Sequence, residues 1–113
     1  DGAQLFPHRK IDVQDLGIHF LCVSGHKMLG PTGIGIVWGR KELLENMDPV
    51  YGGGDMIEEV FYDKATWAPI PHKFEAGTPP YVKAIGLGAA LDYLTNLDMK
   101  NVEKHSDELR TYA

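Results

Sequence analysis

Ser24-Gly25-His26-Lys27 is the stretch that decides the fold of this chain. It follows the apolar run FLCV at 20–23 and precedes GPTGIG at 30–35. This order predicts that Lys27 lies on the loop that follows a buried strand. Glycines let the backbone approach a ligand closely, and the serine and histidine beside the lysine can hydrogen-bond an anion. A Schiff-base lysine is presented to a phosphorylated cofactor in this way.

Strands and helices are predicted to alternate along the chain, which favours an α/β fold. Glycine ends the second predicted strand, and Pro69 and Pro71 interrupt any regular pattern near them. The expected elements are a helical turn over 13–16, strands over 18–24, 34–39 and 59–62, a short helix over 41–46, irregular chain over 66–72 and a last helix from about 101 to the end.

A long helix is predicted to begin after Thr78, which suits an N-cap, with Pro79 at the first helical position. Gly86 and Gly88 each cost helix propensity, roughly 1 kcal/mol relative to alanine, so we expect them to allow close packing. The apolar face expected to pack inward consists of Val82, Ile85, Ala89 and Tyr93, widened by Leu87, Leu91 and Leu94.

Composition excludes several classes of partner. The 113 residues are 43% hydrophobic and 24% charged, which fits one small globular domain. A net charge of -5 without any basic run argues against nucleic acid or an anionic membrane as partner. No apolar run reaches the roughly 20 residues of a membrane span, so we expect a soluble, cytoplasmic protein.

The histidines are scattered without metal-ligand spacing, so no metal site is predicted; they are His8, His19, His26, His72 and His105.

Four blocks resemble successive motifs of the class V aminotransferase superfamily: DGAQ at 1–4, SGHKMLGPTGIGIV at 24–37, YGGGDMI at 51–57 and KFEAGTP at 73–79. They are most similar to cysteine desulfurases of the SufS type, also described as selenocysteine lyases. Thr32 favours this type, because relatives of the NifS and IscS branch usually carry lysine there. The resemblance implies a fragment of the large pyridoxal-phosphate-binding domain of a fold-type I, aspartate aminotransferase-like enzyme. Residues 1–113 would be a partial domain with both ends internal to a larger protein.

The resemblance also implies roles for individual residues. Asp1 would be the carboxylate beside the cofactor's ring nitrogen, and Gln4 would hydrogen-bond its phenolic oxygen. Lys27 would form the Schiff base and then move the substrate's Cα proton. Ser24 and His26 would hold the phosphate or the cofactor, although His26 could instead only order its loop.

Two further implications concern the partner subunit and the sulfur nucleophile. In the family, a glycine of the YGGG loop such as Gly53 and the threonine matching Thr78 reach the phosphate bound by the other subunit, which implies a homodimer. Cys22 is the only cysteine, yet it lies in an apolar strand pattern, where we expect a small buried hydrophobe. The family's catalytic cysteine lies on a loop beyond the matched segment, so Cys22 is not assigned that role.

The implied reaction converts L-cysteine to L-alanine and passes sulfur to an enzyme cysteine as a persulfide. A sulfur-acceptor protein would then supply iron-sulfur cluster assembly. The alternatives are a selenocysteine lyase acting on L-selenocysteine, another class V lyase, or a cofactor-less remnant that serves dimerisation or scaffolding. Asp1, Gln4 and Lys27 together favour an enzyme over the remnant, although the fragment alone is expected to be inactive.

Overall fold

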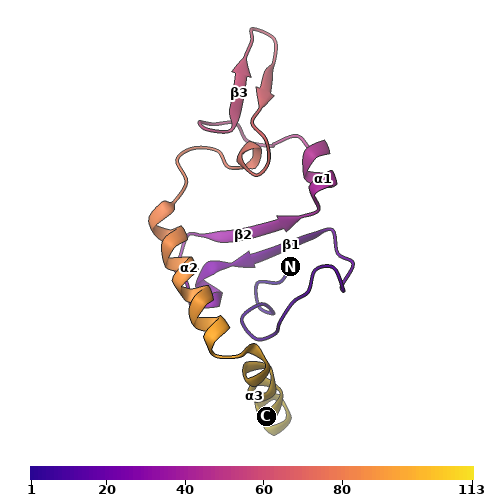
Figure 1. Ribbon diagram of the computed structural model, residues 1–113, viewed down its shortest axis with the longest axis vertical. Helices are drawn as coiled ribbons and strands as arrows, with labels where there is room; N and C mark the ends of the chain where they lie inside the picture. The colour runs from indigo at the N-terminus through magenta and orange to yellow at the C-terminus, as the bar shows by residue number, and fades with distance from the viewer. The chain divides into compact units, whose positions relative to one another are not determined.

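A computed structural model describes residues 1–113 as two compact units (Figure 1). The first unit comprises Asp1–Trp38 and Tyr81–Ala113, and the second comprises Gly39–Pro80. The chain mixes strands and helices, as the sequence predicts for an α/β fold, but they do not strictly alternate, because the last two strands are consecutive and so are the last two helices. None of the helices has the length and apolar character needed to cross a membrane.

The first unit contains a two-stranded sheet of β1 (Phe20–Ser24) and all but the last residue of β2 (Gly35–Gly39). Their arrows run in opposite directions, as a connection of only ten residues allows (Figure 1). β2 begins one residue later than predicted. β1 begins two residues later, after a turn that ends at Gly17 with φ 61°. The turn predicted over 13–16 is present: the Leu16 amide donates to the Asp12 carbonyl (3.2 Å), and the Gly17 amide donates to the Gln14 carbonyl (3.0 Å).

Only one face of β1 is covered. Val23 is buried in a cluster with Met28, Leu87 and Leu94, whereas Cys22 is exposed. The prediction of a buried Cys22 is therefore wrong for this chain. Successive side chains of a strand point to opposite faces, so Cys22 lies on the face away from the cluster.

Helix α2 (Tyr81–Asn96) begins later than predicted. Pro80 disfavours helical backbone at Pro79, so the helix starts at Tyr81 and Thr78 is not its N-cap. The predicted apolar face is also wrong in this chain, because Val82 and Ile85 are 70% and 74% exposed. Two of the leucines that were expected only to widen that face, Leu87 and Leu94, are buried instead, together with Ala90.

The two glycines of α2 differ in their surroundings. A Cβ on Gly86 would lie 2.8 Å from Cγ of Pro31, so close packing is confirmed there. A Cβ on Gly88 would meet nothing within 4 Å, so the same expectation is wrong for Gly88. Helix α3 (Met99–Tyr112) then begins after Asp98, whose side chain accepts a hydrogen bond from the Lys100 amide.

The second unit begins with α1 (Lys41–Asn46), as predicted. Strands β3 (Ile57–Val60) and β4 (Ala65–Trp67) pair antiparallel with an irregularity between Ile57 and Glu59. The prediction of irregular chain over 66–72 is thus wrong at its start, because the prolines act only after β4 has ended. A short 3-10 helix, η2 (His72–Phe74), carries Lys73, which is only 8% exposed. Its Nζ donates to the Glu45 carbonyl oxygen near the end of α1 (3.1 Å).

Candidate functional site

Lys27 lies on a single 3-10 turn, η1 (Gly25–Met28), directly after β1, where the sequence predicts a loop. The turn is closed by hydrogen bonds at both ends. The amides of Leu29 and Gly30 both donate to the Gly25 carbonyl, and the Gly25 amide donates to the Ile34 carbonyl (2.9 Å). The predicted position of Lys27 after the strand is correct, but its backbone is held more firmly than a loop would hold it.

The polar side chains of this turn are free to bind a ligand. Lys27 is half-buried, and its amine forms neither an ion pair nor a hydrogen bond within the chain. Ser24 is half-buried too, and its hydroxyl does not cap η1. His26 is exposed. A hydroxyl, an imidazole and an amine thus gather within four consecutive residues.

The first residues of the chain lie against β1. The Gly2 amide donates to the Cys22 carbonyl (2.8 Å), and a Cβ on Gly2 would lie 2.7 Å from Cδ1 of Leu21. Asp1 is exposed, and its Oδ1 accepts a hydrogen bond from the Ala3 amide (2.8 Å). Asp1 is therefore placed beside the strand that leads to Lys27. Gln4 is exposed in the turns that follow.

The second unit brings two sequence blocks together. The Gly77 amide donates to the Gly54 carbonyl (2.8 Å), and a Cβ on Gly53 would lie 3.0 Å from the Ala76 Cβ. Gly77 has φ 84°, a conformation that favours glycine. The glycine loop and the exposed Thr78 are consequently neighbours, although they are 25 residues apart in sequence (78 - 53).

The sequence gives no reason to single out Met28 and Leu29, which complete the Lys27 turn. Met28 is 0% exposed, and Leu29 has φ 64°, in the left-handed region that branched residues rarely adopt. An apolar residue beside a motif lysine is the only signal that could have identified Met28. No sequence pattern signals the backbone conformation of Leu29.

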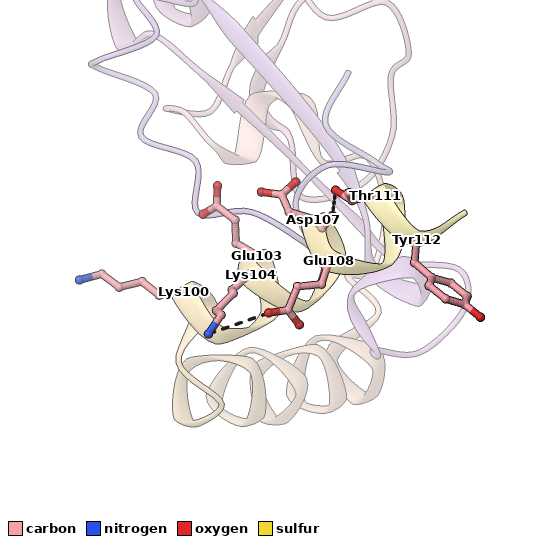
Figure 2. A pocket seen from close by; sticks show the side chains of 7 residues that line it. All are labelled: Lys100, Glu103, Lys104, Asp107, Glu108, Thr111 and Tyr112. Atoms are coloured by element: carbon pink, nitrogen blue, oxygen red, sulfur yellow. Dashed lines mark hydrogen bonds and ion pairs between the residues drawn. The ribbon is translucent and has the colours of Figure 1, made fainter.

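A charged surface on α3 is a weaker candidate site (Figure 2). All of its side chains come from this one helix and extend outward from it, as the close-up shows. Two of them, Lys104 and Glu108, form an ion pair one turn apart (3.9 Å). Such pairs are typical of a solvated helix face. The surface consists of Lys100, Glu103, Lys104, Asp107, Glu108, Thr111 and Tyr112.

Comparison with known proteins points to one family. The aminotransferase class-V family matches residues 1–113. A probable cysteine desulfurase of Streptomyces coelicolor is 54% identical over 113 residues, and the match covers 100% of this chain and 27% of that protein. A probable cysteine desulfurase of Halalkalibacterium halodurans is 55% identical, and the match covers 100% of this chain and 28% of that protein. The chain thus spans about a quarter of the length of these relatives.

Solved structures give the same result. The crystal structure of the cysteine desulfurase CsdA from Escherichia coli superposes with a TM-score of 0.91 at 49% identity, covering 99% of this chain and 28% of that one. The apo cysteine desulfurase of Thermococcus onnurineus NA1 gives 0.89 at 36% identity, covering 97% and 28%. The α/β arrangement found here is therefore that of a segment of the fold-type I domain.

Proposed function

This chain belongs to the aminotransferase class-V family, and from that premise we propose that it forms part of a pyridoxal-phosphate-dependent cysteine desulfurase. The observation that carries the proposal is Lys27, a half-buried lysine whose amine has no partner within the chain, on a hydrogen-bonded turn at the end of β1. The names of the relatives support the same activity. Residues 1–113 would be part of the large cofactor-binding domain.

The residues around Lys27 fit a phosphorylated aldehyde cofactor. The turn presents one amine for the aldehyde carbon and the free Ser24 hydroxyl for an anion. A Cβ on Gly25 would lie 2.8 Å from the Ile34 carbonyl oxygen, so glycine permits the compact turn that presents them. Asp1 supplies a carboxylate beside the same strand. We propose that Asp1, Gln4, Ser24, His26 and Lys27 hold pyridoxal phosphate.

Pyridoxal phosphate, when bound, supplies an electron sink for the substrate's Cα. Lys27 would anchor the cofactor, and its free amine would take the substrate's Cα proton and return it. The Asp1 carboxylate favours the protonated ring nitrogen, because an opposite charge nearby stabilises the charged form. Gln4 would donate a hydrogen bond to the phenolic oxygen, and Ser24 and His26 would donate hydrogen bonds to the phosphate.

The proposed reaction converts L-cysteine to L-alanine and leaves sulfur on an enzyme cysteine as a persulfide, for transfer to an acceptor protein in iron-sulfur cluster assembly. Cys22 is exposed, but it lies within β1, and its carbonyl oxygen accepts a hydrogen bond from the Gly2 amide, which holds its backbone in place. The cysteine that carries the sulfur must approach first the substrate and then the acceptor protein, so we place that cysteine elsewhere in the full-length protein. The SufS type and a cytoplasmic location are part of the proposal.

We further propose that the protein is a homodimer in which Gly53 and Thr78 reach the phosphate bound by the partner subunit. The support in this structure is the hydrogen bond between the Gly77 amide and the Gly54 carbonyl, which fixes the glycine loop beside the threonine. Backbone amides in such a loop pair, together with a hydroxyl, suit an anion.

The test is to express the full-length protein, treat it with borohydride and map pyridoxyl modification by mass spectrometry. We expect modification at Lys27, its loss in Lys27→Ala, and no change in Lys10→Ala, which removes an exposed lysine of the same unit. An unmodified Lys27 peptide in the wild type would contradict the proposal. Alanine and sulfide released from L-cysteine, with L-selenocysteine as competitor, distinguish a desulfurase from a selenocysteine lyase.

A further inference from the structure

We propose that Met28 is a positioning residue for Lys27, setting where the lysine backbone lies relative to β1. This inference rests on the proposed function, in which Lys27 anchors the cofactor. Met28 is the only side chain of η1 that is buried, because Gly25 has none, His26 is exposed and Lys27 is half-buried. The turn is therefore attached to the core of its unit through one side chain.

The contacts of Met28 identify what it is attached to. It is 0% exposed and belongs to a cluster with Val23 of β1 and with Leu87 and Leu94 of α2. A Cβ on Gly30 would lie 2.9 Å from Cδ1 of Leu87, so the residues just after η1 also lie close against α2. Met28 thus connects the strand, the turn and the helix at one point.

Lys27 has no anchor of its own. Its amine has no partner within the chain, and a lysine side chain has four rotatable bonds, so the position of its Cα largely decides where the amine can reach. The hydrogen bonds to the Gly25 carbonyl close the turn but do not fix it against α2. Truncating Met28 would leave a cavity under the turn and allow Lys27 to shift.

Such a shift should affect chemistry more than substrate binding. A displacement of about 1 Å of a reacting group can cost about 100-fold in rate. In the full-length holoenzyme we expect Met28→Ala to lower kcat for L-cysteine about 10- to 100-fold per folded molecule, with KM changed only a few fold. We also expect slower attachment of pyridoxal phosphate to Lys27, followed by its visible absorbance. Met28→Leu, similar in volume, should restore both rates to within a few fold of wild type.

The control is Leu94→Ala. Leu94 belongs to the same cluster but lies seven residues beyond Leu87, about 10 Å along the helix. It should lower the melting temperature as Met28→Ala does, without slowing attachment at Lys27. Where Met28→Ala does not accumulate as folded protein, Met28→Val is measured in its place.

Two results would overturn the positioning role: normal attachment and kcat in the truncated Met28 variant, or an equal loss in Leu94→Ala. The second result would show that core stability alone governs the site. Failure of the proposed function is recognised separately, because the wild-type protein would then show no attachment at Lys27 at all.

Discussion

The amide of Gly2 donates a 2.8 Å hydrogen bond to the carbonyl oxygen of Cys22. This bond joins the first residues of the chain to β1 across 20 residues of sequence (22 - 2). β1 ends at Ser24, and the turn carrying Lys27 follows at once. Asp1 and Lys27, the two groups proposed to act on the cofactor's ring and aldehyde, are thus supported by the same strand.

The first prediction concerns the charge of Asp1. Asp1→Asn retains an oxygen that can accept the Ala3 amide but removes the negative charge, so the local turn should persist. We expect kcat for L-cysteine to fall about 100-fold or more, because loss of one preorganised electrostatic contact costs about 10²–10³. Steady-state alanine formation measures this loss.

Asp12→Asn is the matched control for that charge. Oδ1 of Asp12 accepts the Gln14 amide (2.9 Å), the same two-residue bond that Asp1 makes, and also the Asp15 amide (3.2 Å), in a turn that contains none of the proposed site residues. We expect this variant to retain wild-type kcat. An Asp1→Asn enzyme as active as the control would exclude Asp1 from the ring-nitrogen role.

The second prediction tests the glycine loop of the second unit. A Cβ on Gly53 would lie 3.0 Å from the Ala76 Cβ, whereas one on Gly52 would meet nothing within 4 Å. Gly53→Ala should therefore push the loop away from Ala76 and Gly77 and weaken retention of pyridoxal phosphate about tenfold, the effect of losing one hydrogen bond to a charged group. Dialysis against buffer, followed by measurement of the cofactor's absorbance, gives the retained fraction.

Gly52→Ala serves as the neighbouring control and should retain the cofactor like the wild type. Equal retention in the two variants would remove Gly53 from the proposed phosphate site. Dimerisation is followed in the same samples by analytical ultracentrifugation, so that a loss of the dimer is distinguished from a loss of the anion contact.

Much of the fold could be predicted because local signals coincide with the elements. α1 has the predicted bounds, and β2 begins one residue late, since glycine and charged residues mark their ends. The start of α2 was predicted wrongly. Pro79 by itself favours the first position of a helix, but Pro80 disfavours helical backbone at the residue before it, which is Pro79. The apolar face was misassigned because nearly every side of α2 is apolar, so spacing alone could not select Leu87 and Leu94.

For the candidate site too, the sequence predicts some features and not others. Motif residues such as Lys27 and Ser24 carry chemistry that their types and order reveal. The interactions that hold these residues in place are not visible in a motif, because the burial of Met28 and the bond between Gly2 and Cys22 depend on tertiary packing. The left-handed conformation of Leu29, which ends η1, has no sequence signal either. The exposure of Cys22 likewise follows from which face of β1 the core covers.

The third prediction compares Gly86 and Gly88, which are two residues apart on α2. Gly86→Ala places a Cβ 2.8 Å from Cγ of Pro31, so it should lower stability by about 1–3 kcal/mol through overpacking. Gly88→Ala has open space and should raise stability by about 0.5–1 kcal/mol, because alanine is the better helix former. Urea unfolding of both variants measures the difference. A stabilising Gly86→Ala would show that α2 does not rest on Pro31.

The fourth prediction concerns Arg9, which joins the N-terminal segment to α3. Its guanidinium donates to Glu103 (2.8 Å) and Asp107 (2.7 Å), and these three side chains are 43%, 38% and 41% exposed. Because the side chains of both ion pairs are about 40% exposed, we expect Arg9→Ala to lower the free energy of unfolding by only about 1 kcal/mol in dilute buffer. The loss should shrink in about 1 M salt, where the screening length falls to about 3 Å.

Lys104→Ala provides the comparison for this ion pair. Lys104 and Glu108 are 77% and 62% exposed and 3.9 Å apart, so their pair should contribute almost nothing. Removing Arg9 also removes the cation between Glu103 and Asp107, which are like charges one turn apart on α3, although Arg110 stays 3.6 Å from Asp107. Lys104→Ala does not affect the charges around Glu103 and Asp107 in this way. Equal stabilities of the two variants at low salt would mean that Arg9 does not fasten the N-terminal segment to α3.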